Sequence, residues 1–210
     1  WSSDVCSSDL ITTVYAMGGS TNMYLHLLAI AREAQVPIAI EHIQAIGERV
    51  PLLGNLQPHG PFAMTSLHAI GGVPVVMKEL LRAGLLHGDV MTVTGKTIAE
   101  NLKDVKFNPK QEVIRATSNP LAPTGGVVGL RGNLAPDGAI VKVAGLKHQV
   151  HRGPVRVFDC EEDAFAAVEK RDYKAGDVIV IRYEGPKGGP GMREMLSTTA
   201  ALYGQGLSDQ

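Results

Sequence analysis

The sequence predicts an α/β fold in two parts, a helix-rich first part and a second part rich in short strands. Two observations support this expectation. Up to about residue 105, apolar residues recur at the spacing of amphipathic helices. Beyond it, short β-prone runs are separated by glycine, proline and Asn-Pro. The chain of 210 residues is long enough for one large domain or two small ones.

The first part is expected to contain several helices. Met23, Leu27, Ala31 and Ala34 fall on one face of a predicted helix, which Pro37 ends. The same kinds of signal predict further helices at 41–49, 71–89 and 97–102, and β-prone runs predict strands at 11–15 and 90–94.

The second part is expected to be a compact β domain that begins near 105–118. A helix at 161–170 interrupts it, with Asp159 as the expected cap and acidic residues at its start, as the helix dipole favours. The predicted strands are the runs at 112–116, 125–132, 138–145, 155–159 and 177–183.

The first ten residues, WSSDVCSSDL, have no hydrophobic period and contain Ser-Ser-Asp twice. They lack the basic start and the apolar core of a signal peptide. The repeat resembles a translation of sequencing-adapter DNA, so we expect 1–10 to be a non-native tail. A native disordered tail would give the same structural expectation. In either case we expect no chemistry from Cys6.

Composition narrows the class of protein. A net charge of −1 gives no indication of nucleic-acid or anionic-membrane binding, and no apolar run reaches the length of a membrane span. Cys6 and Cys160 are the two cysteines, too few for a disulfide framework. The chain is therefore expected to belong to a reducing compartment, the cytoplasm.

The stretch YEGPKGGPGMREML at 183–196 is the sharpest candidate for chemistry. Its glycines allow backbone N–H groups to approach an anion, and a helix is expected to begin near Met192. Glu194 would lie in the first turn, and its carboxylate suits a hard cation such as magnesium. A rigid turn with a surface glutamate is the alternative. The candidate anion-binding residues of this loop are Gly185, Lys187, Gly188, Gly189 and Gly191.

The stretch MGGSTN at 17–22 is the second candidate, a glycine pair that leads into a polar helix start. Gly18, Gly19, Ser20 and Thr21 could bind an anion. On local chemistry alone, an ordinary helix cap is the favoured interpretation.

Three other features are weaker. TGKT at 94–97 lacks the upstream glycine of a phosphate-binding loop, because position 90 is valine. His148 and His151 have no third ligand near them in sequence, and Cys160 is interpreted as a small buried residue. Arg131 and Asn133 stand between glycines that a tight strand connection explains, although substrate contact is possible.

Five blocks taken together resemble the dihydroxy-acid/6-phosphogluconate dehydratase family, which also includes sugar-acid dehydratases. The resemblance covers about 11–207. The blocks are MGGSTNMYLHLLAIA, GGVPVVMKELL, GDVMTVTGKTIAENL, NPLAPTGGVVGLRGNLAPDGAIVK and YEGPKGGPGMREML, in that order.

The resemblance implies a hydro-lyase that converts 2,3-dihydroxy acids to 2-keto acids in valine, leucine and isoleucine biosynthesis. It implies an iron–sulfur cluster that acts on the leaving 3-hydroxyl, a magnesium ion at the carboxylate end and a serine base. It also implies a homodimer when the protein is full length. A sugar-acid or 6-phosphogluconate dehydratase is one alternative, and a non-catalytic anion-binding module is another.

Matched to this chain, the resemblance makes Glu194 a magnesium ligand and places 185–191 and 18–22 at the active site. The form of 131–139 favours the dihydroxy-acid branch. The family's cluster cysteines and its other magnesium ligands lie upstream of this sequence, and the serine lies downstream. We therefore expect an internal fragment that is inactive alone and contains no catalytic residue. It would comprise the end of a large α/β domain at 11–112 and a truncated β-barrel-like domain at 113–210.

Overall fold

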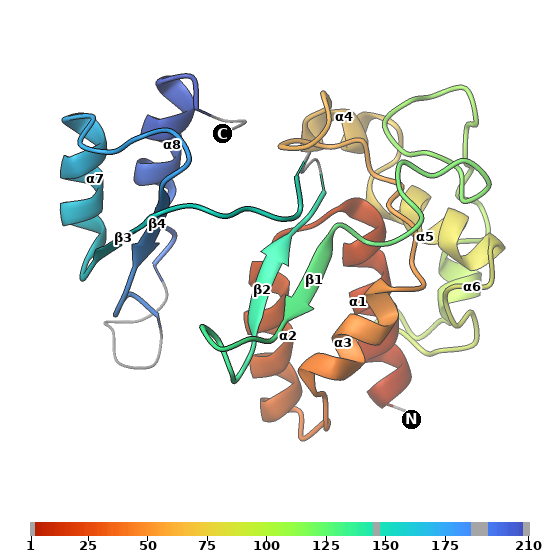
Figure 1. The fold of residues 1–210 in the computed structure, drawn as a ribbon. Coiled ribbons are helices and arrows are strands. Elements are labelled where there is room, and N and C mark those ends of the chain that lie inside the picture. Colours follow the sequence, from red (N-terminus) through yellow and green to blue (C-terminus); the bar gives the residue numbers. More distant parts are fainter. Residues whose placement is uncertain (1–2, 145–147, 186–192, 208–210) are drawn as a thin grey trace. The chain divides into compact units, whose positions relative to one another are not determined.

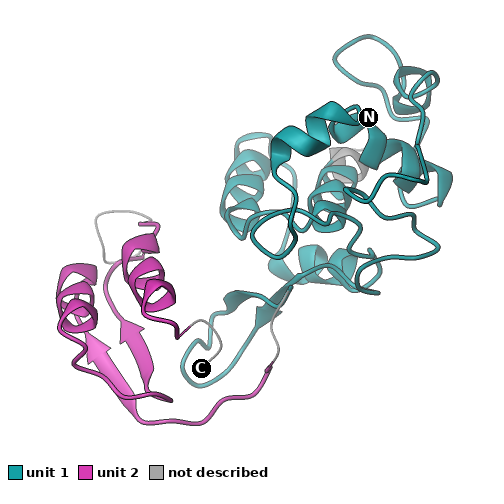
Figure 2. Cartoon of the chain, turned by 90° about the horizontal axis from the view of Figure 1, so that it is seen from above, with its two compact units in different colours: residues 1–145 teal, residues 146–210 magenta. Residues whose placement is uncertain are grey.

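The computed structural model describes residues 3–144, 148–185 and 193–207, with the backbone only for 3–6. The chain forms two compact units, residues 1–145 and residues 146–210 (Figure 2). Each unit is described by itself.

The first unit is built on the helix α1, against which α2, α3 and α5 pack (Figure 1). Its core is formed by buried aliphatic and tyrosine side chains, which come mainly from these helices and from the loops at 50–56 and 113–114. The helices of this unit are α1 (Ser3–Met17), α2 (Asn22–Glu33), α3 (Ile40–Gly47), α4 (Met64–Ala69), α5 (Val73–Arg82) and α6 (Ile98–Asn101).

Helix α1 corrects two expectations, a structureless stretch at 3–10 and a strand at 11–15. Ile11 and Tyr15 lie one helical turn apart, and both are buried in the core. Asp9 is also buried, and it accepts hydrogen bonds from the backbone N–H of His87 and pairs with its ring Nδ1 at 2.9 Å. Burial along one helical face outweighs the β propensity of this run.

Helices α2, α3, α5 and α6 lie where the sequence pattern predicted helices, although α5 ends at Arg82 and not near 89. Helix α4 was not expected, and the strand expected at 90–94 is wrong. Met91 and Thr97 form only an isolated antiparallel bridge around an exposed turn, in which Gly95 has a φ of 73°. The Thr92 hydroxyl donates to the Lys96 carbonyl at 2.8 Å, which closes the turn. Thr97 then caps α6 in a reciprocal arrangement with Glu100.

The strands β1 (Val127–Leu130) and β2 (Ala139–Lys142) form an antiparallel pair in the first unit. Strand β1 packs against α3, and the backbone N–H of Gly125 donates to the Gly47 carbonyl at 3.0 Å. The compact units therefore divide after the hairpin, at residue 145, and not at 112, where the β-rich composition begins.

The second unit contains the strands β3 (Val155–Phe158) and β4 (Val178–Ile181), which pair in parallel, and the helices α7 (Glu161–Glu169) and α8 (Leu196–Gly204). Helix α7 is the crossover that a parallel pair requires, and α8 packs beside it (Figure 1). Cys160, not Asp159, is the N-cap residue of α7. The Asp159 carboxylate instead accepts from the Arg182 side chain at 2.6 Å.

The α/β class is confirmed, but the barrel expected in the second part is not present in the described residues. Their strands form two separate two-stranded sheets, one antiparallel in the first unit and one parallel in the second. Of the helices in the described ranges, none has the length and apolar character to cross a membrane.

Candidate functional site

A cavity of about 380 Å³ opens in the first unit where the turn between α1 and α2 meets the loop at 56–58. Ten of the described residues line it, contributed by this turn, by that loop, by the start of α4 and by the end of β2. They are Met17, Gly18, Gly19, Ser20, Thr21, Leu56, Gln57, Pro58, Met64 and Lys142. The structure thus brings all four residues of the predicted glycine–serine–threonine site to one cavity.

The two glycines of this turn are required by close packing. Gly18 has a φ of 66°, and a Cβ atom there would lie 2.4 Å from the His59 ring and 2.9 Å from Leu52. A Cβ atom on Gly19 would lie 2.4 Å from the Val14 side chain. Larger residues would therefore push the turn away from its place on the cavity wall.

The polar residues of the turn form an incomplete helix cap. Thr21 is the N-cap of α2, but its side chain accepts no capping hydrogen bond. The Ser20 hydroxyl instead accepts from the Asn22 backbone N–H at 3.2 Å. Within the described part of the chain, the backbone N–H groups of Ser20 and Thr21 find no acceptor. The turn therefore retains unused donors beside the cavity.

Lys142 is the charged residue among the described lining of this cavity, and the sequence interpretation did not predict it. It is the last residue of β2, and its Nζ donates to the Gly18 carbonyl at 2.9 Å. Burial lowers the pKa of the Lys142 ammonium group. The only signal in the sequence was a lysine at the end of an apolar strand, which is also typical of an ordinary surface strand.

The second predicted site is described only in part. Gly185 is exposed, whereas Lys187, Gly188, Gly189 and Gly191 lie outside the described residues. Glu194 is exposed and precedes α8, which begins at Leu196. The expectation that a helix begins near Met192 and carries Glu194 in its first turn is therefore wrong.

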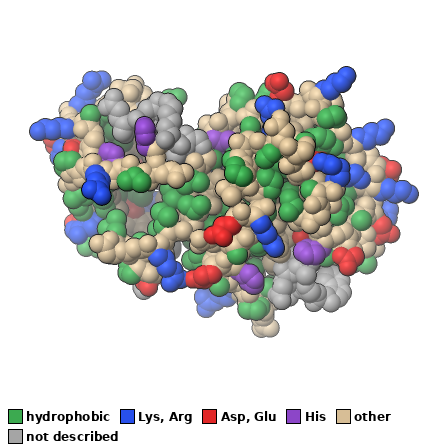
Figure 3. Space-filling view, turned by 45° about the vertical axis from the view of Figure 1, so that its right-hand side comes forward, with side chains coloured by type: hydrophobic (Ala, Val, Ile, Leu, Met, Phe, Trp, Pro, Cys, Tyr) green, Lys and Arg blue, Asp and Glu red, His purple; other side chains and the backbone are tan. Residues whose placement is uncertain are grey.

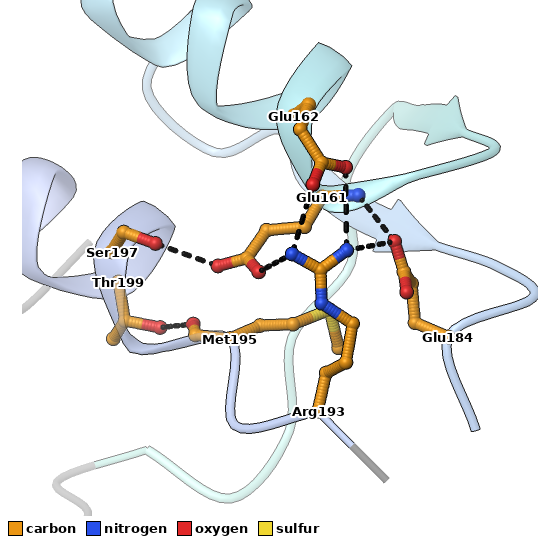
Figure 4. A network of polar contacts seen from close by, with 7 residues as sticks. All are labelled: Glu161, Glu162, Glu184, Arg193, Met195, Ser197 and Thr199. Atoms are coloured by element: carbon orange, nitrogen blue, oxygen red, sulfur yellow. Dashed lines mark hydrogen bonds and ion pairs between the residues drawn. The ribbon is translucent and has the colours of Figure 1, made fainter. Parts of the chain in front are cut away.

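Arg193, the neighbour of Glu194, lies at the centre of a group of carboxylates (Figure 4). Its guanidinium nitrogens lie 2.9 Å from Glu162, 3.0 Å from Glu184 and 3.2 Å from Glu161. Hydrogen bonding to Glu162 and Glu184 raises the pKa of Arg193. The Ser197 hydroxyl donates to Glu161 at 2.7 Å, so this group ties the start of α8 to the start of α7 and the segment after β4.

The described residues do not by themselves form a site for magnesium or for an iron–sulfur cluster. In those ranges, no three His, Cys, Asp or Glu side chains are grouped as ligands. The carboxylates of Glu161, Glu162 and Glu184 are engaged by Arg193. Cys160 is a half-buried free cysteine at the start of α7. Any magnesium site that uses Glu194 needs ligands beyond this group.

Two of the weaker candidates, Arg131 and His151, have structural partners. Arg131 forms an exposed ion pair with Glu41 of α3. The His151 ring lies 3.0 Å from the Gly176 carbonyl, and His148 is exposed. Acidic and basic side chains are intermingled on the face shown in Figure 3, as a net charge of −1 suggests.

Comparison with known families defines the class of protein. Residues 7–101 match the dihydroxy-acid/6-phosphogluconate dehydratase N-terminal model, and residues 112–210 match the C-terminal model of the same family. The chain belongs to the dihydroxy-acid/6-phosphogluconate dehydratase family, as the sequence motifs indicated.

Individual relatives narrow the resemblance to one branch. The chain is 60% identical over 199 residues to the dihydroxy-acid dehydratase of Parvibaculum lavamentivorans, which is 94% of this chain and 34% of that protein. It is 56% identical over 201 residues to the dihydroxy-acid dehydratase of Chloroflexus aurantiacus, and the match covers 95% of this chain and 36% of that protein. The identity to the dihydroxy-acid dehydratase of Sulfurisphaera tokodaii is 53% over 202 residues, and this match also covers 95% of this chain and 36% of that protein. The chain thus spans about a third of the length of these relatives.

Proposed function

We propose that the chain is part of a hydro-lyase that converts 2,3-dihydroxy acids to 2-keto acids in branched-chain amino-acid biosynthesis. The observation that carries the proposal is the 60% identity to a dihydroxy-acid dehydratase over 94% of the chain. In this proposal the enzyme acts on a small molecule in the cytoplasm, does not bind nucleic acid or membranes, and is a homodimer at full length.

The proposal assigns separate tasks to the two candidate sites. The turn at Gly18–Thr21 lines a cavity of a size that suits a small acid. Glu194 is proposed as one carboxylate ligand of magnesium, and Gly185–Gly191 as an active-site loop. The bound metal groups would polarise the leaving hydroxyl, which is otherwise a poor leaving group. The other ligands and the serine base are assigned to parts of the enzyme outside this sequence.

The domain assignment is also part of the proposal. Residues 11–112 would be the end of the N-terminal dehydratase domain, and 113–210 the truncated C-terminal domain. The separation of the two family matches between 101 and 112 supports this boundary. Residues 1–10 are proposed to be non-native in origin, although α1 begins at Ser3 and the family match begins at residue 7.

A chimera tests the activity in a full-length enzyme. The corresponding third of the Parvibaculum dihydroxy-acid dehydratase is replaced by residues 11–207, and the purified chimera is assayed after anaerobic reconstitution. We expect turnover of 2,3-dihydroxyisovalerate, and growth without valine and isoleucine when the chimera is expressed in a dehydratase-deficient strain. A folded chimera that lacks turnover would contradict the proposal.

Two comparisons sharpen this test. Glu194→Gln in the chimera should raise the magnesium concentration needed for half-maximal activity by about tenfold or more, because an amide is a weaker ligand for a hard cation. Unchanged magnesium dependence would remove Glu194 from the site. The family name also covers 6-phosphogluconate dehydratases, so turnover of aldonic acids alone would favour the sugar-acid alternative.

A further inference from the structure

We propose that the ammonium group of Lys142 binds the carboxylate of a small aliphatic hydroxy acid in the cavity beside the Gly18–Thr21 turn. This inference rests on the proposed function and names the group that recognises the acid end of the substrate. It concerns the first unit alone.

The first step of the argument is an unbalanced charge. Among the described residues, Lys142 takes part in no ion pair, and the Gly18 carbonyl is the one acceptor of its ammonium group. None of the ten described residues that line the cavity is acidic. An ammonium group has three donors, and a partly buried charge without a counter-charge is costly. An anion in the cavity would supply the missing charge and form a charge-assisted hydrogen bond.

The second step is the position of the lysine. Lys142 pairs with Val127 in the β1–β2 register, which fixes its backbone at the edge of the cavity. The 2.9 Å bond to the Gly18 carbonyl then holds its Nζ against the α1–α2 turn. The unused backbone donors of Ser20 and Thr21 belong to the same turn and add to the attraction for an anion, but the lysine supplies the charge.

The third step is the composition of the walls. Leu56, Pro58 and Met64 are apolar, whereas Gln57 and Ser20 bring hydrogen-bonding groups. Such a lining suits a short branched carbon chain that bears hydroxyl groups. A sugar phosphate carries more than one negative charge and would meet a single cation in the described lining. Because both oxygens of a carboxylate accept bonds, its contact with Lys142 is compatible with a metal ion on the other oxygen.

The test is a titration of the 210-residue chain followed by nuclear magnetic resonance of the Gly18–Thr21 amides. The ligands are 2,3-dihydroxyisovalerate and its neutral amide, which have the same carbon chain. We expect the acid to shift these amide signals and to bind about tenfold or more tightly than the amide. Lys142→Met should weaken binding of the acid by a similar factor, because the charge-assisted bond is lost.

Two variants make the result specific. Lys96→Met removes the same charge from the exposed turn at 92–97 and should leave binding unchanged. Lys142→Arg keeps the charge and should retain most of the preference for acid over amide. The melting temperature of Lys142→Met should not fall, because the substitution removes a partly buried charge that has no counter-charge among the described residues. The loss of a merely structural lysine would lower it. If Lys142→Met does unfold, the proposal is judged by whether Lys142→Arg still binds the acid more tightly than the amide.

The proposal is wrong if the acid does not bind, if the acid and the amide bind equally, or if Lys142→Met binds the acid as the parent chain does. The chimera assay separates this failure from that of the proposed function. An active chimera together with an unchanged Lys142→Met affinity would refute the lysine subsite alone. An inactive chimera together with Lys142-dependent binding would refute the dehydratase assignment alone.

Discussion

Two charged residues of the first unit, Glu79 and Lys142, differ in how far their hydrogen-bonding capacity is used by other described residues. Glu79 is fully buried, and its carboxylate accepts bonds from the Arg82 side chain and from the backbone and hydroxyl of Thr117. Lys142 has one carbonyl acceptor among the described residues. A satisfied buried charge is expected to serve the fold, whereas an unsatisfied charge in a cavity is expected to serve a ligand.

Glu79→Gln is expected to lower the free energy of unfolding by about 1–3 kcal/mol, because charge-assisted bonds become neutral ones. Burial acts to raise the pKa of Glu79, but the bonds from Arg82 and Thr117 outweigh it, and the pKa is lowered from 4.5. The carboxylate therefore stabilises the fold above pH 4.5, and this contribution is lost as pH falls through the lowered pKa. Urea unfolding at several pH values measures both effects.

Glu112→Gln is the matched control for this prediction, because Glu112 is exposed in the same unit. It should change the stability little at any pH. Equal effects of the two substitutions, or a loss from Glu79→Gln that persists undiminished in acid, would contradict the account of Glu79.

The sequence predicts the position of a turn well where the signal is local. The glycine pair at 18–19 predicted a turn, and that turn lines a cavity. Lys142 could not be found in this way, because its contact with Gly18 joins residues 124 positions apart. The helix start near Glu194 was misplaced because Arg193 is held by carboxylates from other elements before α8 begins.

At the scale of the elements, α1 shows that packing can make a β-prone run helical. The run at 11–15 is β-prone, yet the Tyr15 ring fits against Gly47 at the end of α3 and against Gly125 before β1. The Tyr15 hydroxyl also bonds to the hydroxyl of Tyr24 in α2. The pattern of α2 and α3 was predictable because their apolar spacing is regular, whereas the conformation of α1 depends on partners distant in sequence.

Gly125→Ala is expected to destabilise the first unit by about 1–3 kcal/mol through overpacking. A Cβ atom there would lie 2.3 Å from the Tyr15 ring. Gly132→Ala is the control, because no atom lies within 4 Å of the corresponding Cβ position. Denaturant unfolding of both variants measures the difference, and equal midpoints would show that Tyr15 has room to move.

At the scale of the whole molecule, the sequence predicted two parts, and the chain does form two compact units. The units divide at residue 145, later than the boundary near 112 that the composition suggested. Short strands become frequent after about residue 105, but the β1–β2 hairpin packs against a helix of the first unit. The expected barrel failed for a related reason. Strands β3 and β4 pair with each other in parallel through α7, and in the described residues neither pairs with β1 or β2.

The 210-residue chain alone is expected to show no dehydratase activity and to bind no stoichiometric iron–sulfur cluster. A cluster is held by several cysteine thiolates, and this sequence has two cysteines, at positions 6 and 160. Iron and labile sulfide are measured after anaerobic reconstitution, with the full-length Parvibaculum enzyme as the positive control. A stoichiometric content of both in the chain would refute this prediction.

The fit between Tyr15, Gly47 and Gly125 also bears on how such genes can exchange segments. The three residues lie on α1, at the end of α3 and just before β1, so they are far apart in the gene but meet in one contact. A crossover between relatives anywhere from codon 15 to codon 125 could combine the tyrosine of one parent with a larger residue of the other. Viable recombinants should therefore inherit the three positions together, and a crossover at the family-domain junction would separate the third from the other two.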